Sequence, residues 1–191
     1  MSEDMIYPKE EADEYRKRFS LLNSTIGFKM TFSFDGNTET VEGKLYPRKA
    51  PLTVKNFVEL AKSGFYNGMP VHRYIRNTLI QTGDPTGTGK GGSDKEIYGE
   101  FYQNGIRENN LAHLEGALGM ARYDADPNSA RSQFYIMFKP DFIFNGNYAV
   151  FGYVTKNIKA LNKINRLIPS TKDLKPSKPI ILEKVEILDK D

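Results

Sequence analysis

The chain has 191 residues, of which 39% are hydrophobic and 27% are charged, and its formal net charge is +3. This composition is typical of a single globular domain, and the interleaving of opposite charges argues against a nucleic-acid surface. The lack of cysteine excludes disulfides, thiolate nucleophiles and zinc–thiolate sites, which suits a reducing compartment. No run approaches the ~18 apolar residues of a membrane span, so we expect a cytoplasmic protein without a membrane segment.

The first periodic segment, residues 8–22, predicts a short amphipathic helix that begins near Pro8. Its apolar residues recur at steps of three and four: Ala12, Tyr15, Phe19 and Leu22. We assign this helix to an N-terminal extension, residues 1–24, ahead of a main domain formed by residues 25–191. Because exposed apolar stripes are uncommon, we expect the stripe to pack on the main domain rather than to recruit a partner.

A β-hairpin follows the helix. Apolar and polar residues alternate from Ile26 to Phe34, which predicts a strand with one buried face. The turn residues Asp35-Gly36-Asn37 come next, and alternation resumes from Val41 to Leu45. Such a turn between alternating segments is a strong hairpin signal.

The rest of the chain mixes short strands with two helices. Residues 51–63 and 158–167 have helical periodicity, whereas the strand candidates lie at 71–75, 79–80, 117–121, 133–138, 149–154 and 180–188. Because most strands are not separated by helices, a mainly β fold is indicated: an antiparallel barrel capped by helices rather than a parallel sheet.

Arg73 is the most informative residue, because it lies in the strand Val71–Ile75 within a run that we expect to be buried. A guanidinium that is buried without partners is costly. Either a carboxylate neutralises Arg73, or Arg73 faces a cleft in which a ligand uses its donors. We favour the cleft, because buried ion pairs stabilise folds poorly.

The loop Gly83–Gly92, with the sequence GDPTGTGKGG, contains the glycine spacing of a dinucleotide-binding fingerprint. That fingerprint requires a helix immediately after it, which presents amides to the phosphates. The following residues, SDKEIYGE, have no helical apolar face. We therefore predict a mobile surface loop and no nucleotide cofactor.

His72 and His113 are the two histidines of the chain. Neither has a nearby hydroxyl or carboxylate in a pattern that marks a catalytic triad or a metal site. We therefore expect both to be structural histidines with satisfied hydrogen bonds, and we expect no metal.

Together these segments resemble a cyclophilin, a peptidyl-prolyl cis–trans isomerase, over about residues 25–190. Five ordered blocks carry the resemblance: Ala50–Gly68, Val71–Gly92, Gly116–Ala121, Ser132–Met137 and Asn145–Gly152. It implies a closed eight-stranded antiparallel barrel with two capping helices, a ligand cleft on the outer surface, and no cofactor. Arg122 and the longer connection to Gln133 resemble bacterial members more than animal ones.

The resemblance also implies roles for individual residues. Arg73 would be the catalytic residue, and Gln133 would orient it. Gln81 and the backbone of Ala121 and Arg122 would hold the substrate peptide. The proline pocket would consist of Leu79, Tyr135, Phe144 and Tyr148.

Two substrate-binding positions depart from the family pattern. Thr78 stands where a Phe is usual, and burying a Phe is worth about 1.5–3 kcal/mol, so we expect a raised Michaelis constant. Ile143 replaces a tryptophan that is important for cyclosporin binding in animal members. We therefore expect weak cyclosporin binding.

The implied reaction is rotation about X-Pro bonds in unfolded or regulatory client proteins, which would assist protein folding. In a second hypothesis the same cleft binds proline peptides without accelerating their isomerisation, and the chain is a non-catalytic binding module. Acceleration of peptide isomerisation, abolished by Arg73→Ala, would distinguish the enzyme from the module.

Overall fold

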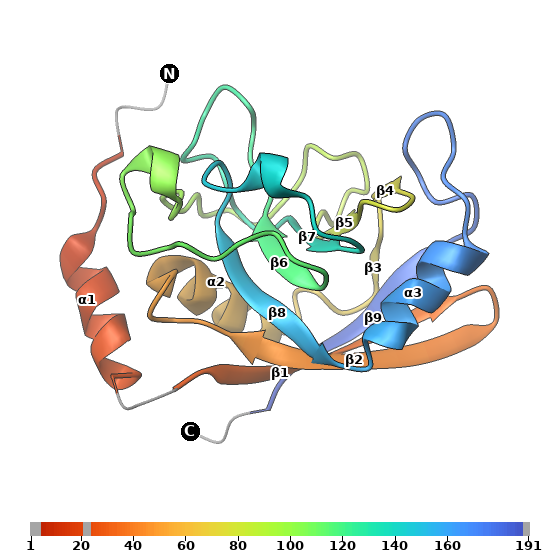
Figure 1. The fold of residues 1–191 in the computed structure, drawn as a ribbon, viewed down its shortest axis with the longest axis horizontal. Coiled ribbons are helices and arrows are strands. Elements are labelled where there is room, and N and C mark those ends of the chain that lie inside the picture. The colour runs from red at the N-terminus through yellow and green to blue at the C-terminus, as the bar shows by residue number, and fades with distance from the viewer. Residues whose placement is uncertain (1–4, 21–23, 189–191) are drawn as a thin grey trace.

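The computed structural model describes residues 5–20 and 24–188. Within them, one antiparallel sheet has the strand order β3-β9-β1-β2-β8-β6-β7-β5-β4 (Figure 1). The strands are β1 Ile26–Phe34, β2 Asn37–Leu45, β3 Met69–Pro70, β4 Arg73–Ile75, β5 Leu79–Thr82, β6 Ala117–Met120, β7 Phe134–Met137, β8 Val150–Lys156 and β9 Ile180–Ile187. The helices are α1 Lys9–Arg18, α2 Pro51–Lys62 and α3 Ile158–Leu167, with 3₁₀ turns η1 Tyr102–Asn104 and η2 Phe142–Phe144. The mainly β prediction is confirmed.

The predicted hairpin is formed by β1 and β2. Phe34 pairs with Asn37, and the two residues between them have positive φ angles, 45° at Asp35 and 73° at Gly36. Two positive φ angles match the tight turn that fits the right-handed twist of paired strands. The alternate residues of β1, from Ile26 to Phe34, are all buried. Local sequence therefore sets both the turn and the buried face.

The segment between Met69 and Ile75 joins the two edges of the sheet. β3 pairs with β9, whereas β4 pairs with β5. Between these strands, Val71 N donates to Ile180 O at 2.9 Å and His72 N donates to Gln81 O at 3.2 Å. The chain thus changes partner in mid-segment, which curls the sheet into a barrel and gives nine strands instead of the expected eight.

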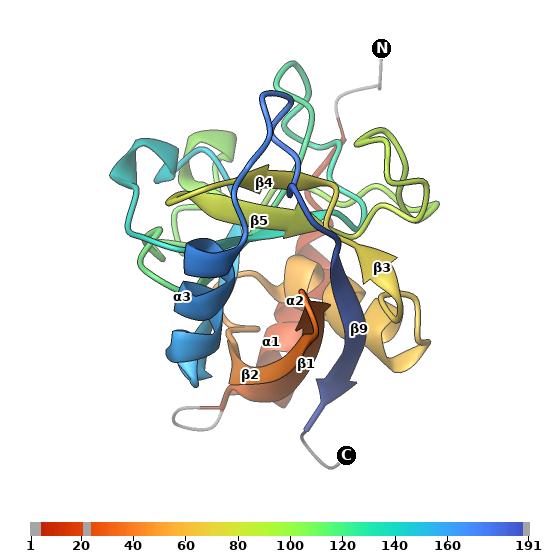
Figure 2. The same ribbon diagram turned by 90° about the vertical axis from the view of Figure 1, so that its right-hand side faces the viewer.

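Helices α2 and α3 lie toward opposite ends of the barrel in Figure 1, and Figure 2 shows α3 in front and α2 behind. α2 buries Val54, Phe57 and Ala61, and α3 buries Leu161 and Ile164. Both helices occupy the residues that their periodicity predicted. None of the helices in residues 5–20 and 24–188 is long and apolar enough to cross a membrane.

The N-terminal helix α1 packs on α2, outside the barrel (Figure 1). Ala12 is fully buried and Tyr15 is 8% exposed, so the predicted apolar stripe packs on the main domain; its last member, Leu22, is outside the described residues. Ahead of the helix, Tyr7 Oη donates to Glu100 Oε2 at 3.0 Å. The assignment of residues 1–24 as a separate extension stays a prediction.

Candidate active site

Two apolar clusters lie on opposite faces of the same strands. In a strand, successive side chains point to opposite faces. Ile80 and Ile136 belong to the cluster inside the barrel, whereas their neighbours Leu79 and Tyr135 belong to a second cluster on the outer face. Strands β5, β6 and β7 are consequently buried throughout.

Arg73 lies on this outer face and is exposed, so the expectation that its run would bury it is wrong. The neighbouring Tyr74 is the residue that points into the barrel, where it is fully buried. Arg73 Nη1 donates to Gln81 Oε1 at 3.4 Å. Among the ion pairs of the described residues none includes Arg73, which agrees with the cleft alternative.

Gln81 connects Arg73 to Gln133. The two residues Arg73 and Gln81 face each other in the β4–β5 ladder, and Gln81 faces Tyr135 in the β5–β7 ladder. Directly paired residues point to the same face, so Arg73, Gln81 and Tyr135 form one row. Gln81 Nε2 donates to Gln133 Oε1 at 2.9 Å. The structure thus brings together the three polar residues that the sequence predicted.

The glycine-rich loop holds Gln133 from the other side. Gln133 Nε2 donates to Gly89 O at 3.0 Å and to Gly91 O at 2.7 Å. The loop itself is anchored by the buried Asp84, whose carboxylate accepts from Thr86 N at 2.8 Å and from Gly89 N at 2.6 Å. These bonds make the loop a support of the site, rather than only the mobile surface segment that we expected.

The electrostatics of Asp84 reflect this role. Burial alone would raise the pKa of the Asp84 carboxyl, but hydrogen bonds from Thr86, Gly91 and Gly89 lower it to about 2. A carboxylate that accepts several N–H and O–H bonds keeps its charge to low pH. Asp84 is therefore ionised at any working pH, and its bonds with the loop persist.

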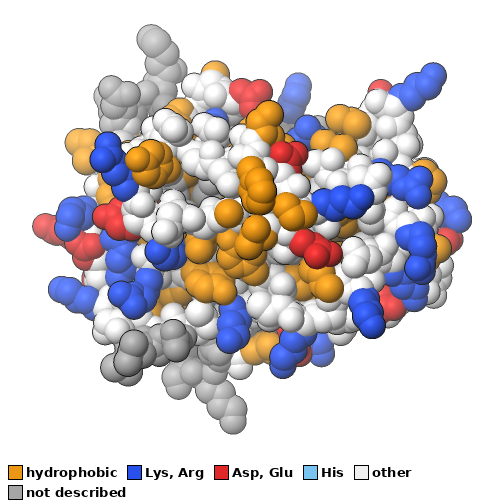
Figure 3. All heavy atoms as spheres, in the orientation of Figure 1, with side chains coloured by type: hydrophobic (Ala, Val, Ile, Leu, Met, Phe, Trp, Pro, Cys, Tyr) orange, Lys and Arg blue, Asp and Glu red, His pale blue; other side chains and the backbone are white. Residues whose placement is uncertain are grey.

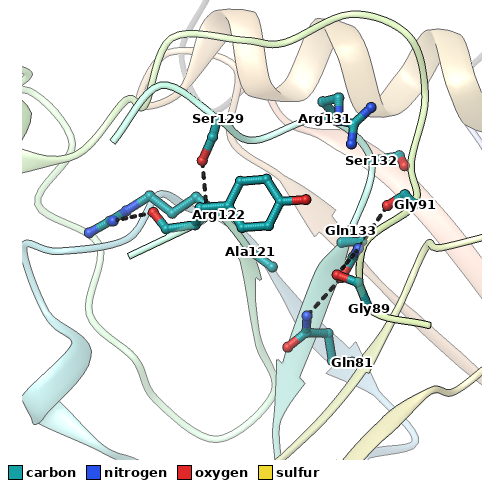
Figure 4. A pocket seen from close by; sticks show the side chains of 10 residues that line it. Gln81, Gly89, Gly91, Ala121, Arg122, Ser129, Arg131, Ser132 and Gln133 are labelled. Atoms are coloured by element: carbon teal, nitrogen blue, oxygen red, sulfur yellow. Dashed lines mark hydrogen bonds between the residues drawn. The ribbon is translucent and has the colours of Figure 1, made fainter. Parts of the chain in front are cut away.

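A small cleft of about 80 Å³ opens beside Gln81 and Gln133 (Figure 4). Its lining residues are Gln81, Gly89, Gly91, Ala121, Arg122, Tyr123, Ser129, Arg131, Ser132 and Gln133. Four of these were predicted as substrate-binding residues, and none of the ten is acidic. Arg131 donates to the carbonyl oxygens of Ser93 and Lys90, both at 3.3 Å. The cleft therefore has a mixed polar and apolar lining, and its charged lining residues are the two arginines.

The residues predicted for the proline pocket lie together on the outer face. Leu79 and Tyr135 are each 4% exposed and form a base, against which the partly buried Phe144 and Tyr148 pack. The rings of Phe144 and Tyr148 meet edge to face with centroids 5.8 Å apart. Ala121 belongs to this cluster and also lines the cleft, so the apolar surface and the cleft are contiguous.

Arg122 lines the cleft, and its predicted role there concerns its backbone; its side chain packs elsewhere. Its guanidinium lies over the rings of Phe101, at 4.9 Å, and Tyr148, at 4.7 Å, and Nη2 donates to Asn147 O at 2.8 Å. In Figure 4 its side chain extends away from Gln81 and Gln133. Arg122 therefore braces Tyr148, and its side chain does not point into the cleft.

The two positions that depart from the family pattern lie outside the buried part of the outer cluster. Thr78 is partly buried, and its carbonyl accepts from Phe138 N at 2.8 Å. Ile143 is 76% exposed, next to Phe142 at 62%. Figure 3 shows hydrophobic side chains gathered near the middle of the face that carries β6 in Figure 1, with charged side chains around them.

The histidines differ from each other. His113 is fully buried, and Tyr135 Oη lies 2.6 Å from its Nε2, so the expectation of a satisfied structural histidine is confirmed. His72 is 9% exposed, and its ring nitrogens have no hydrogen-bond partner among the described residues. The expectation of satisfied hydrogen bonds is therefore not met at His72 by this geometry, although the side chain of Gln133 lies close enough to favour its protonated form. Sequence reasoning did not connect His113 with Tyr135, because no periodic pattern links a loop residue to a strand residue.

The comparison with known families agrees with this geometry. The family model described as "Cyclophilin type peptidyl-prolyl cis-trans isomerase/CLD" matches residues 29–187. The chain belongs to this family. The cyclophilin resemblance of the five sequence blocks is thereby confirmed, and so is the implied class of enzyme, a peptidyl-prolyl cis–trans isomerase.

Relatives and solved structures of the cyclophilin family extend the match. A peptidyl-prolyl cis-trans isomerase-like 1 protein from Emericella nidulans is 39% identical over 160 residues, which cover 83% of this chain and 91% of that protein. The Homo sapiens protein of the same name is 38% identical over 130 residues, which cover 68% of this chain and 76% of that protein. These relatives are fungal and mammalian, so the resemblance to bacterial members stays a prediction.

A crystal structure of a cyclophilin type isomerase from Cryptosporidium parvum superposes with a TM-score of 0.76 at 30% identity, and the match covers 88% of this chain and all of that one. A second structure of that protein, in the presence of the dipeptide Ala-Pro, gives a TM-score of 0.75 at 31% identity and covers 86% of this chain and 99% of that one. Both likenesses support the barrel architecture.

Proposed function

We propose that this cyclophilin-family chain accelerates rotation about X-Pro bonds with Arg73 as its catalytic residue, and that proline-containing segments of unfolded or regulatory clients bind on the outer barrel face. The row Arg73, Gln81 and Tyr135 supports the proposal most directly, because it puts an exposed cation next to an apolar surface of aromatic rings. The substrate would place its proline ring on that surface and its flanking chain along the cleft.

The barrier to the reaction is electronic. An X-Pro bond resists rotation by ~18–20 kcal/mol, because twisting it removes amide resonance. In the twisted transition state the proline nitrogen becomes pyramidal and regains a lone pair. A fixed cationic donor stabilises that lone pair, whereas it gains little from the planar ground state. No covalent bond is broken, so the residues need only position and stabilise.

Arg73 is suited to this step by the way it is held. Gln81 uses one of the five guanidinium N–H donors, and among the described residues no other side chain pairs with Arg73, so the remaining donors can reach a ligand. Gln133 and the glycine loop fix Gln81 in turn. This support orients the guanidinium before substrate arrives, and electrostatic stabilisation depends on such preorganisation.

The outer apolar cluster would grip the proline ring while the preceding carbonyl rotates. Leu79, Tyr135, Phe144 and Tyr148 supply the surface. The amide of Ala121 already donates to Gln133 O at 3.0 Å, so the backbone of this segment would hold a peptide through carbonyl oxygens. The solved relative that was studied in the presence of Ala-Pro supports a proline-containing ligand here.

Two residues of this chain that differ from the usual family pattern, Thr78 and Ile143, would weaken ligand binding without removing catalysis. Thr78 supplies no aromatic wall, which would raise the Michaelis constant. Ile143 is 76% exposed and smaller than a tryptophan, so we expect weak cyclosporin binding. A dissociation constant in the low nanomolar range would contradict this.

Thr78 also favours a second candidate, a proline-peptide binding module without turnover. A protease-coupled assay on peptides of the Ala-Ala-Pro-Phe type separates the two functions. Acceleration that depends on Arg73 supports the enzyme, whereas saturable peptide binding without acceleration supports the module.

A further inference from the structure

The hydroxyl of Tyr135 is buried beneath the proposed proline-binding surface. Tyr135 is 4% exposed, and a buried phenol needs a hydrogen-bond partner. Its Oη lies 2.6 Å from His113 Nε2, and the two rings are nearly parallel, with an interplanar angle of 11° and centroids 5.8 Å apart. The partner of Tyr135 is therefore a fully buried imidazole.

The hydrogen-bond directions follow from Asn145. Asn145 Oδ1 lies 2.7 Å from the backbone N of His113 and 2.9 Å from its Nδ1. A backbone N–H only donates, so the amide atom that faces it is the oxygen, and the same oxygen must accept from a protonated Nδ1. His113 Nε2 then carries the lone pair, and Tyr135 Oη donates to it. Burial lowers the pKa of His113, which keeps this neutral form.

His113 holds the short turn η2 at both of its ends. Its carbonyl accepts from Asp141 N at 3.0 Å, and Asn145 bonds to its amide and ring. Between these two residues lies Phe144, whose ring centroid is 5.7 Å from that of His113. One histidine thus connects the strand that carries Tyr135 with the turn that carries Phe144.

The space for the phenol comes from Gly119. Gly119 faces Tyr135 in the β6–β7 ladder, and a Cβ atom at this position would overlap Cζ and Oη of Tyr135. Gly119 therefore fixes where the ring can lie, and His113 fixes its tip.

We propose that His113 is a positioning residue that sets the spacing of Tyr135 and Phe144 in the surface that receives the proline ring. The inference rests on the proposed function of that surface. His113 itself is fully buried and does not touch the substrate. Because it shapes a surface that grips the ring equally in ground and transition states, its loss should raise KM and leave kcat nearly unchanged.

The test compares His113→Leu, His113→Gln and Tyr135→Phe with the double variant His113→Leu/Tyr135→Phe. His113→Leu leaves the Tyr135 hydroxyl unpaired, and we expect KM to rise about tenfold with kcat within about threefold of the parent. His113→Gln retains an acceptor, so it should recover much of the loss. In the Tyr135→Phe background, His113→Leu should change KM less than in the parent, because the two groups act as a pair.

Two further measurements keep the outcomes distinct. Imidazole ¹⁵N spectra of the parent should show that Nδ1 of His113 is protonated and Nε2 is not. The opposite tautomer overturns the proposal. Because this measurement uses the parent protein, it tests the proposal even if a variant fails to fold. Equal KM effects of His113→Leu in both backgrounds also overturn it. If the parent binds a proline peptide without accelerating its isomerisation, the proposed enzyme function fails, and the same comparison of peptide dissociation constants still tests His113.

Discussion

Arg73 and Gln81 face each other across the β4–β5 ladder, and the Arg73 guanidinium donates to Gln81 Oε1 at 3.4 Å. This single long hydrogen bond orients the cation without neutralising it. The charge faces solvent at the edge of the apolar outer cluster. Such a cation is available to a ligand, which a carboxylate-paired arginine would not be.

Replacing Arg73 by alanine should lower the isomerisation rate by about 10²–10³, by analogy with the loss of one preorganised donor at an oxyanion hole. Arg76→Ala is the matched control. Arg76 is exposed directly after the end of β4, and its guanidinium donates to Asn165 O at 3.2 Å rather than to Gln81. Protease-coupled kinetics measure both variants. If the isomerisation rate of Arg73→Ala is within threefold of the parental rate, Arg73 takes no part in the mechanism.

Thr78→Phe should lower KM, because it restores an apolar wall worth about 1.5–3 kcal/mol when buried. A tenfold decrease in KM corresponds to ~1.4 kcal/mol, and kcat should stay near the parental value. Thr78→Val, which has nearly the parental side-chain size, serves as the control and should change KM little. An unchanged KM in Thr78→Phe would show that position 78 does not contact the substrate.

Asp84→Asn should weaken the anchor of the glycine loop and thereby loosen Gln133. The folded-state pKa of Asp84 is lowered to about 2 from an ordinary value of 3.8. The stabilisation is therefore fully present above about pH 4 and is lost as the pH falls toward 2. Urea unfolding should show that the parent loses more stability than Asp84→Asn over this pH range.

The exposed Asp94 provides a control, since Asp94→Asn changes the same charge in the neighbouring segment without a buried anchor. If both variants have the same acid dependence as the parent, Asp84 does not hold the loop. At neutral pH, Asp84→Asn should also lower activity, because the carbonyl oxygens that hold Gln133 belong to this loop.

Tyr7→Phe should destabilise the protein by about 1–3 kcal/mol and leave isomerase activity unchanged. Its hydroxyl donates to the fully buried Glu100, whose carboxylate also accepts from Thr53 N at 2.7 Å at the start of α2. Removing one hydrogen-bond donor from a buried acceptor costs about 1–3 kcal/mol of folding stability. Ile6→Ala is the control, because the neighbouring Ile6 is 88% exposed and its loss should change the unfolding free energy little. Equal effects of Tyr7→Phe and Ile6→Ala would contradict the stabilising contact between Tyr7 and Glu100.

The sequence predicted those parts of the fold in which the local pattern is strong. The alternation of β1 and the helical periodicity of α2 and α3 each belong to one element with one buried face, so they are visible without knowledge of the neighbours. The burial of Arg73 was misjudged for the opposite reason. Its neighbours Val71, His72 and Tyr74 are all buried, and such a run conceals which of its side chains points outward.

Residue type alone singled out Arg73, whereas Gln81 and Gln133 were named through the cyclophilin resemblance. The hydrogen bonds among the three depend on ladder register, which sequence periodicity does not fix across distant strands. The contact between His113 and Tyr135 depends on the path of the loop before β6, and the anchoring role of Asp84 depends on the fold of its own loop. Each of these needs the three-dimensional structure.

The separation of the two apolar clusters means that the barrel can keep its stability while its ligand preference changes. The side chains of Thr78 and Ile143 belong to neither buried cluster, so replacing them leaves the packing of both clusters in place. Residues at the edge of the outer face can therefore vary without loss of the packed interior.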